Sequence, residues 1–142
     1  MSSAMSNRFQ RTREDHSRET AEDYVEMIHD LIAETGEARA VDIALRFGIS
    51  KATVAKTIQR LVREGLVSSQ PYRSIFLTDE GERLAASSRA RHELVLTFLR
   101  TLGVSAEAAE SDAEGIEHHV SRETLAAMEA FIASQRATSA KR

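Results

Sequence analysis

The order of short elements between residues 40 and 78 most constrains how this chain can fold. Two amphipathic stretches are separated by Gly48, and two strand-like segments around a turn follow them. Ser50 suits a helix N-cap, and Gly65 suits a helix end. We expect helices at 40–47 and 51–64 and strands at 66–70 and 74–78. This order predicts a winged helix-turn-helix.

The second helix of this motif has one apolar side and one polar, basic side. Val54, Ile58, Leu61 and Val62 are expected to pack inward. A recognition helix usually meets base edges near its N-terminus, whereas more distal arginines contact phosphates. The candidate DNA-contacting residues are Arg39, Ser50, Lys51, Ala52, Thr53, Lys56, Arg60, Arg63 and Arg73. The alternative is an ordinary amphipathic helix with a solvated basic face.

The distribution of charge favours the DNA-binding interpretation. The whole chain has a net charge of −3, but residues 39–73 hold seven basic and two acidic residues, a local balance of +5. The remaining residues therefore carry a balance of −8. A basic segment inside an acidic chain is typical of a phosphate-binding face beside a cation-binding region.

The segments on either side of this motif predict helices. A capping box at Thr20–Asp23 would start a helix over 21–34, and later helices are expected at 79–102, 105–119 and 121–134. The fold class is thus mainly α, an N-terminal winged helix-turn-helix followed by an α-helical dimerisation domain. The expected domains are a flexible or helical arm at 1–20, the DNA-binding domain at 21–78, the helical domain at 79–136 and a disordered tail at 137–142.

Acidic and histidine side chains recur at helical spacing outside the basic segment. Glu114, Glu117 and His118 are three and four residues apart, so one helix face would carry all three. Asp23 and Glu26 repeat the spacing, and Gly115 would allow a close backbone approach between the ligands. Each residue has an ordinary explanation as a solvated carboxylate or a core histidine. Together with His92 on an inner helix face, they predict a divalent metal site.

Three motifs resemble the manganese transport regulator (MntR) branch of the diphtheria toxin repressor (DtxR) family. They are Asp23-Tyr-Val-Glu26, Arg91-His92-Glu93-Leu94 and Asp112-Ala-Glu-Gly-Ile-Glu-His-His119. The resemblance covers roughly residues 20–136 and implies a dimeric, metal-activated winged-helix regulator. It implies a two-ion manganese site held by Asp23, Glu26, His92, Glu114, Glu117 and His118. The iron-responsive branch has methionine and cysteine at the positions of Asp23 and Glu114.

The available ligand chemistry agrees with this resemblance. The chain has no cysteine, so a metal must be held by oxygen and imidazole, which suits Mn²⁺. Zn²⁺, Co²⁺ and Fe²⁺ can also bind such ligands, because Mn²⁺ is lowest in the affinity series. Metal binding would fasten the DNA-binding part to the dimerisation part and set the spacing of two recognition helices on a palindromic operator.

Apolar residues near the C-terminus predict a homodimer. The candidate interface residues are Phe98, Leu99, Leu102, Leu125, Met128, Phe131 and Ile132. No apolar run is long enough to cross a membrane and the first residues do not form a signal peptide, so we expect a cytoplasmic protein. Two alternatives remain: a winged-helix repressor that senses a small organic ligand, and a carboxylate/histidine metallohydrolase. The second lacks a His-Glu-x-x-His motif.

Overall fold

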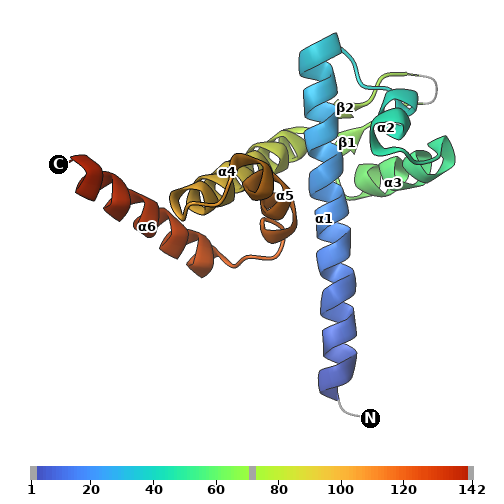
Figure 1. Cartoon of the computed structure of the whole chain (residues 1–142). Helices are drawn as coiled ribbons and strands as arrows, with labels where there is room; N and C mark the ends of the chain where they lie inside the picture. The colour runs from blue at the N-terminus through green and yellow to red at the C-terminus, as the bar shows by residue number, and fades with distance from the viewer. Residues whose placement is uncertain (1–2, 71–72, 141–142) are drawn as a thin grey trace. The chain divides into compact units, whose positions relative to one another are not determined.

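The computed structural model describes residues 3–70 and 73–140 of this chain. These residues form helices and one small antiparallel sheet (Figure 1), which confirms the predicted mainly α class. The elements are α1 (Ser3–Thr35), α2 (Ala40–Phe47), α3 (Lys51–Arg63), β1 (Val67–Ser68), β2 (Phe76–Leu77), α4 (Asp79–Thr101), α5 (Ala106–Ile116) and α6 (Arg122–Ala140). Two compact units result: His16–Ser87, and Ser88–Arg142 with Met1–Asp15.

The core of the His16–Ser87 unit is built on one face of α1. Ile28 and Leu31 of this face are buried with Ile43 of α2 and with Ile58 and Leu61 of α3. Burial of each such side chain contributes roughly 1.5–3 kcal/mol. Only part of the inward set predicted for α3 is confirmed, because Val62 is 41% exposed. The core therefore fixes α3 with its other faces toward solvent.

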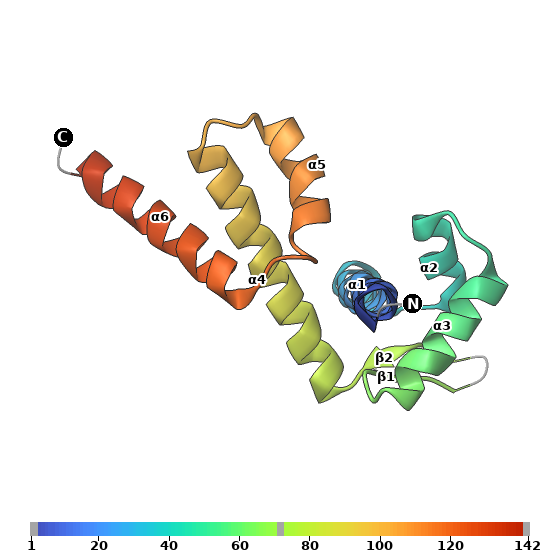
Figure 2. The same ribbon diagram turned by 90° about the horizontal axis from the view of Figure 1, so that it is seen from below.

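The turn between α2 and α3 follows the local chemistry expected from the sequence. Gly48 has a φ of 68°, in the left-handed region that glycine enters without steric cost. The hydroxyl of Ser50 accepts a hydrogen bond from the backbone N–H of Thr53 at 3.1 Å and so caps α3. α2 and α3 lie beside the hairpin in both views (Figures 1 and 2). The helix-turn-helix prediction is confirmed at its turn and its cap.

The hairpin is shorter than the segments predicted for it. β1 pairs with β2 through Val67 opposite Leu77 and Ser68 opposite Phe76. The turn residues Pro71 and Tyr72 lie outside the described residues. A side-chain carbon added at Gly81 would lie 2.1 Å from the carbonyl oxygen of Leu66, so glycine allows the first turn of α4 to approach β1.

In the second unit, the end of α4 packs with α5 and α6. Val95 and Ile132 are fully or nearly buried, and the rings of Phe98 and Phe131 meet edge to face at 5.7 Å. Small buried residues on α5, Ala109 and Ala113, allow the helix to pack closely. The hydroxyls of Ser105 and Ser121 cap the next two helices, at the two positions where the sequence predicted these helices to begin.

Two helix boundaries lie far from the predicted ones, the start of α1 and the end of α6. α1 begins at Ser3, so Thr20 is interior, and its hydroxyl donates to the carbonyl of His16 instead of capping a helix. Neither glycine nor proline interrupts residues 3–35, so the helix continues through the polar arm. For the same reason α6 continues through residues 137–140 of the predicted tail, whereas 141–142 lie outside the described residues.

Candidate metal centre

A cluster of one imidazole and two carboxylates forms between α4 and the C-terminal end of α5. One ligand atom each from His92, Glu114 and Glu117 lies within 4.8 Å of the others. α5 ends at Ile116, three residues before its predicted end, but Glu117 keeps helical angles as the C-cap, and its N–H still bonds to the carbonyl of Ala113. Glu114 and Glu117 therefore share one side of α5, as their spacing predicted.

His92 contacts carboxylates through both ring nitrogens. Its Nδ1 lies 2.5 Å from a carboxylate oxygen of Glu117, and its Nε2 lies 3.2 Å from one of Glu110. Since both carboxylates accept hydrogen bonds, both nitrogens can donate only when the ring is protonated. Glu110 was not among the predicted ligands, although it lies one turn before Glu114 on the same side of α5. That spacing was the available signal.

The protonation equilibria of this pair are shifted by burial and by charge. Burial disfavours the imidazolium, but the hydrogen bond and charge of Glu117, together with Glu110 and Glu114, outweigh it and raise the pKa of His92 above 6.5. Burial raises the pKa of Glu117, and its hydrogen bond to His92 opposes this only in part. Both groups therefore bind protons more readily than the free side chains do, and a divalent ion must compete with those protons.

His118 lies beyond the end of α5 and is nevertheless buried. Only 2% of its side chain is exposed, and its Nε2 lies 3.3 Å from the second carboxylate oxygen of Glu117. The helical spacing used to predict this residue is wrong at His118, since it occupies a turn. The turn still brings its ring to Glu117. His119, the next residue, is exposed.

Asp23 and Glu26 lie one turn apart on α1, in the His16–Ser87 unit. Both are half-buried, and Oε1 of Glu26 is shielded from solvent without a hydrogen-bond partner among the described residues. A buried carboxylate oxygen without a partner is costly unless a cation or proton compensates it. This orphaned oxygen and the oxygen-and-imidazole cluster on α4 and α5 both fit a divalent metal.

The predicted DNA-contacting residues lie on the His16–Ser87 unit. Lys51, Ala52, Lys56 and Arg63 are exposed on α3. Arg60 is different, because its guanidinium donates to the carbonyl of Ser17 at 3.1 Å and pairs with Glu64 at 3.4 Å. A groove of about 900 Å³ runs beside α3. Its lining includes four basic residues and no carboxylate among the described residues: Arg39, Lys51, Arg63 and Arg73.

Comparison with known proteins decides the family. Residues 16–75 match the N-terminal DNA binding domain of iron dependent repressors, and residues 78–137 match their metal binding and dimerisation domain. Transcriptional regulator MntR of Salmonella typhimurium is 56% identical over 133 residues, which are 94% of this chain and 84% of that protein. The chain belongs to the MntR branch of the DtxR family. This family comprises transcriptional regulators, so the metallohydrolase alternative is wrong.

More distant relatives support the same family. The HTH-type transcriptional regulator MntR of Bacillus subtilis is 41% identical over 100 residues, 70% of each chain. A solved manganese-dependent transcriptional repressor in complex with manganese has a TM-score of 0.70 and 31% identity, and covers 80% of this chain. This chain spans about half the length of that solved chain, 52%. Within the described residues, no helix is long and apolar enough to span a bilayer.

Proposed function

We propose that this chain is a manganese-responsive transcriptional regulator of the cytoplasm. In this proposal it binds a palindromic operator as a homodimer and represses manganese uptake genes when Mn²⁺ is bound. The observation that carries the proposal is the cluster of His92, Glu114 and Glu117 within the part that matches a metal binding and dimerisation domain. Solved relatives with bound manganese or zinc support the metal class.

The proposed ligand set comprises six residues and up to two ions. It is Asp23, Glu26, His92, Glu114, Glu117 and His118. The first two enter on the motif resemblance and on the orphaned oxygen of Glu26. The ions supply positive charge that relieves repulsion between carboxylates. Hard oxygen ligands favour Mn²⁺, although Fe²⁺, Co²⁺ and Zn²⁺ are expected to compete.

The proposed DNA interface is the exposed side of α3 with the hairpin. Lys51, Ala52, Thr53 and Lys56 would face base edges, and Arg39, Arg63 and Arg73 would face phosphates. Ser50 contributes mainly by capping α3, since its hydroxyl accepts from Thr53. Arg60 is the weakest member of the set, because its guanidinium already has two partners within the unit. The domain boundaries proposed are 21–78 and 79–136, flanked by the arm at 1–20 and the tail at 137–142.

A metal titration of DNA binding tests the proposal. Retention of an operator duplex would be measured against free Mn²⁺, Fe²⁺, Co²⁺ and Zn²⁺ at fixed pH and salt. We expect tight, saturable binding with Mn²⁺ and weak, salt-sensitive binding after chelation. Equal DNA affinity with and without every metal would disprove a metal-responsive function.

A further inference from the structure

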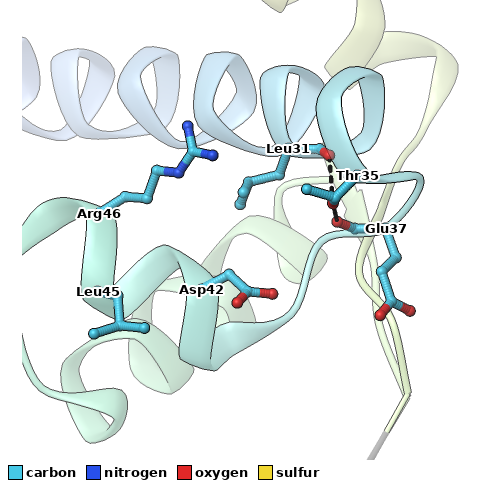
Figure 3. A pocket seen from close by; sticks show the side chains of 6 residues that line it. All are labelled: Leu31, Thr35, Glu37, Asp42, Leu45 and Arg46. Carbon is cyan, nitrogen blue, oxygen red and sulfur yellow. Dashed lines mark hydrogen bonds between the residues drawn. The ribbon is translucent and has the colours of Figure 1, made fainter.

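Glu37 lies in the connection between α1 and α2, where its backbone carbonyl accepts a hydrogen bond from Thr35. The hydroxyl of Thr35 lies 2.8 Å from the carbonyl oxygens of both Leu31 and Glu37. Figure 3 shows these residues at a small pocket, with the carboxylate of Glu37 pointing away from the other labelled side chains. Glu37 lines this pocket, and its carboxylate has hydrogen-bond partners outside the pocket lining.

The carboxylate of Glu37 joins two segments that are far apart in the sequence. One oxygen accepts a hydrogen bond from Nε of Arg39 at 3.1 Å, and the other accepts from the hydroxyl of Ser74 at 3.0 Å. Beside them, the backbone N–H of Ile75 donates to the carbonyl of Ala38 at 2.8 Å. The base of the hairpin is therefore fixed to the residues that precede α2.

Arg39 is held in a way that leaves it available to an anion. Its side chain is 57% exposed, and its contact with Glu37 uses only Nε. Among the described residues its terminal nitrogens have no hydrogen-bond partner. A guanidinium oriented through Nε can still present its outer N–H groups to a phosphate. Arg73, next to Ser74, lines the same basic groove as Arg39.

We propose that Glu37 is a positioning residue for DNA binding. Its carboxylate orients Arg39 and fixes the hairpin base, so that Arg39 and Arg73 meet phosphates as a preorganised pair. A side chain already held in its binding geometry loses less conformational entropy on association. This inference rests on the proposed DNA-binding function. It assigns a favourable role to Glu37, although Coulomb repulsion between its carboxylate and the phosphates of DNA would by itself weaken binding.

The two interpretations of Glu37 predict effects of opposite sign. Glu37→Ala removes a negative charge, so simple electrostatics predicts tighter DNA binding. Loss of positioning predicts weaker binding, by about tenfold, with the salt slope reduced by about one unit. Binding would be measured on the full-length protein with saturating Mn²⁺ and duplex DNA of random sequence, because phosphate contacts dominate such binding. Unchanged or tighter binding by Glu37→Ala would overturn the inference.

Glu34→Ala is the matched control. It removes the same charge from the end of α1 and releases Arg46 of α2, which lies 2.5 Å from Glu34, but it touches neither Arg39 nor the hairpin. We expect its DNA affinity to equal or slightly exceed that of the wild type. An equal loss in both variants would count against a specific role for Glu37.

Two further variants separate the two contacts of the Glu37 carboxylate, one with Arg39 and one with Ser74 of the hairpin. Ser74→Ala removes the hydrogen bond to Glu37 without changing the charge, and it should cause a smaller loss of DNA affinity, about threefold. In an Arg39→Ala background, Glu37→Ala should lower the DNA affinity by no more than Ser74→Ala does, since only the contact of Glu37 with Ser74 remains to be lost. A full tenfold loss in that background would exclude Arg39 as the route. If the wild type itself failed to bind duplex DNA with Mn²⁺, the proposed function would fail rather than this inference.

Discussion

At the scale of single residues, Glu117 is the centre of the cluster on α4 and α5 that we propose to bind the metal. Its two carboxylate oxygens contact His92 and His118, and its side chain is only 2% exposed. Because Glu117 is buried, water cannot take over the contacts of its carboxylate with the two imidazoles if that carboxylate is removed. The site therefore depends more on Glu117 than on the exposed Glu110, which contacts His92 alone in the described part of the cluster.

We predict that Glu117→Gln nearly abolishes the response to Mn²⁺. The amide keeps the shape but supplies no negative charge, so Mn²⁺ affinity should fall at least about a hundredfold. Glu110→Gln is the matched control and should lower it by about tenfold or less. Calorimetric titration with Mn²⁺ and operator retention measure both effects. A normal response by Glu117→Gln would rule out the proposed site.

Mn²⁺ binding should also depend on pH through His92. Because the pKa of His92 is raised above its ordinary value, the metal-free protein holds this proton more tightly than a free imidazole would, and a metal must displace it. Affinity should be constant above that raised pKa and fall by about tenfold per pH unit below it. Titrations in two buffers of different ionisation enthalpy would measure proton release. His119→Ala should leave the release unchanged, whereas an Mn²⁺ affinity that stayed constant as the pH was lowered to 6.5 would contradict the assignment.

At the scale of elements, the sequence predicted order well and boundaries less well. The cap at Ser50 and the helix starts near Ser105 and Ser121 were predictable, because each serine supplies a local acceptor to its own helix. The start of α1 was missed because Thr20 fits a capping box, although an uninterrupted helix already surrounds it. Helical spacing predicted Glu114 and Glu117 but not the turn that positions His118. Neither boundary error changed the predicted ligand set.

Gly81→Ala tests the junction of the hairpin with α4, and Gly115→Ala in α5 serves as its comparison. Gly81→Ala would place a carbon 2.1 Å from a backbone oxygen of Leu66, so α4 must shift, and stability should fall by about 1–3 kcal/mol. Gly115 was expected to permit a close backbone approach, but no described atom lies within 4 Å of its added carbon. Gly115→Ala should instead stabilise α5 by about 0.5–1 kcal/mol. Thermal unfolding compares the Gly81→Ala and Gly115→Ala variants, and equal unfolding midpoints would refute the close packing of Gly81 against Leu66.

At the scale of the whole molecule, dimerisation must cover apolar surface that one chain leaves exposed. Ile132 is buried and Phe98 contacts Phe131 within the chain, so these residues stabilise the second unit itself. Leu102, directly after the end of α4, is 54% exposed. Of the predicted interface residues, it is the one that a substitution can change with least damage to the folded chain.

Leu102→Asp should therefore weaken the homodimer without unfolding the protein. Burying a leucine at an interface contributes roughly 1.5–3 kcal/mol, so a charge there should raise the dimer dissociation constant by at least about tenfold. Operator binding should weaken in parallel, because two recognition helices must meet two half-sites. Leu45→Asp is the control: Leu45 is 76% exposed on α2, in the DNA-binding part, and should leave dimerisation intact. Sedimentation equilibrium measures both variants with and without Mn²⁺. If Leu102→Asp remained as dimeric as Leu45→Asp, the interface would have to lie elsewhere on the second unit.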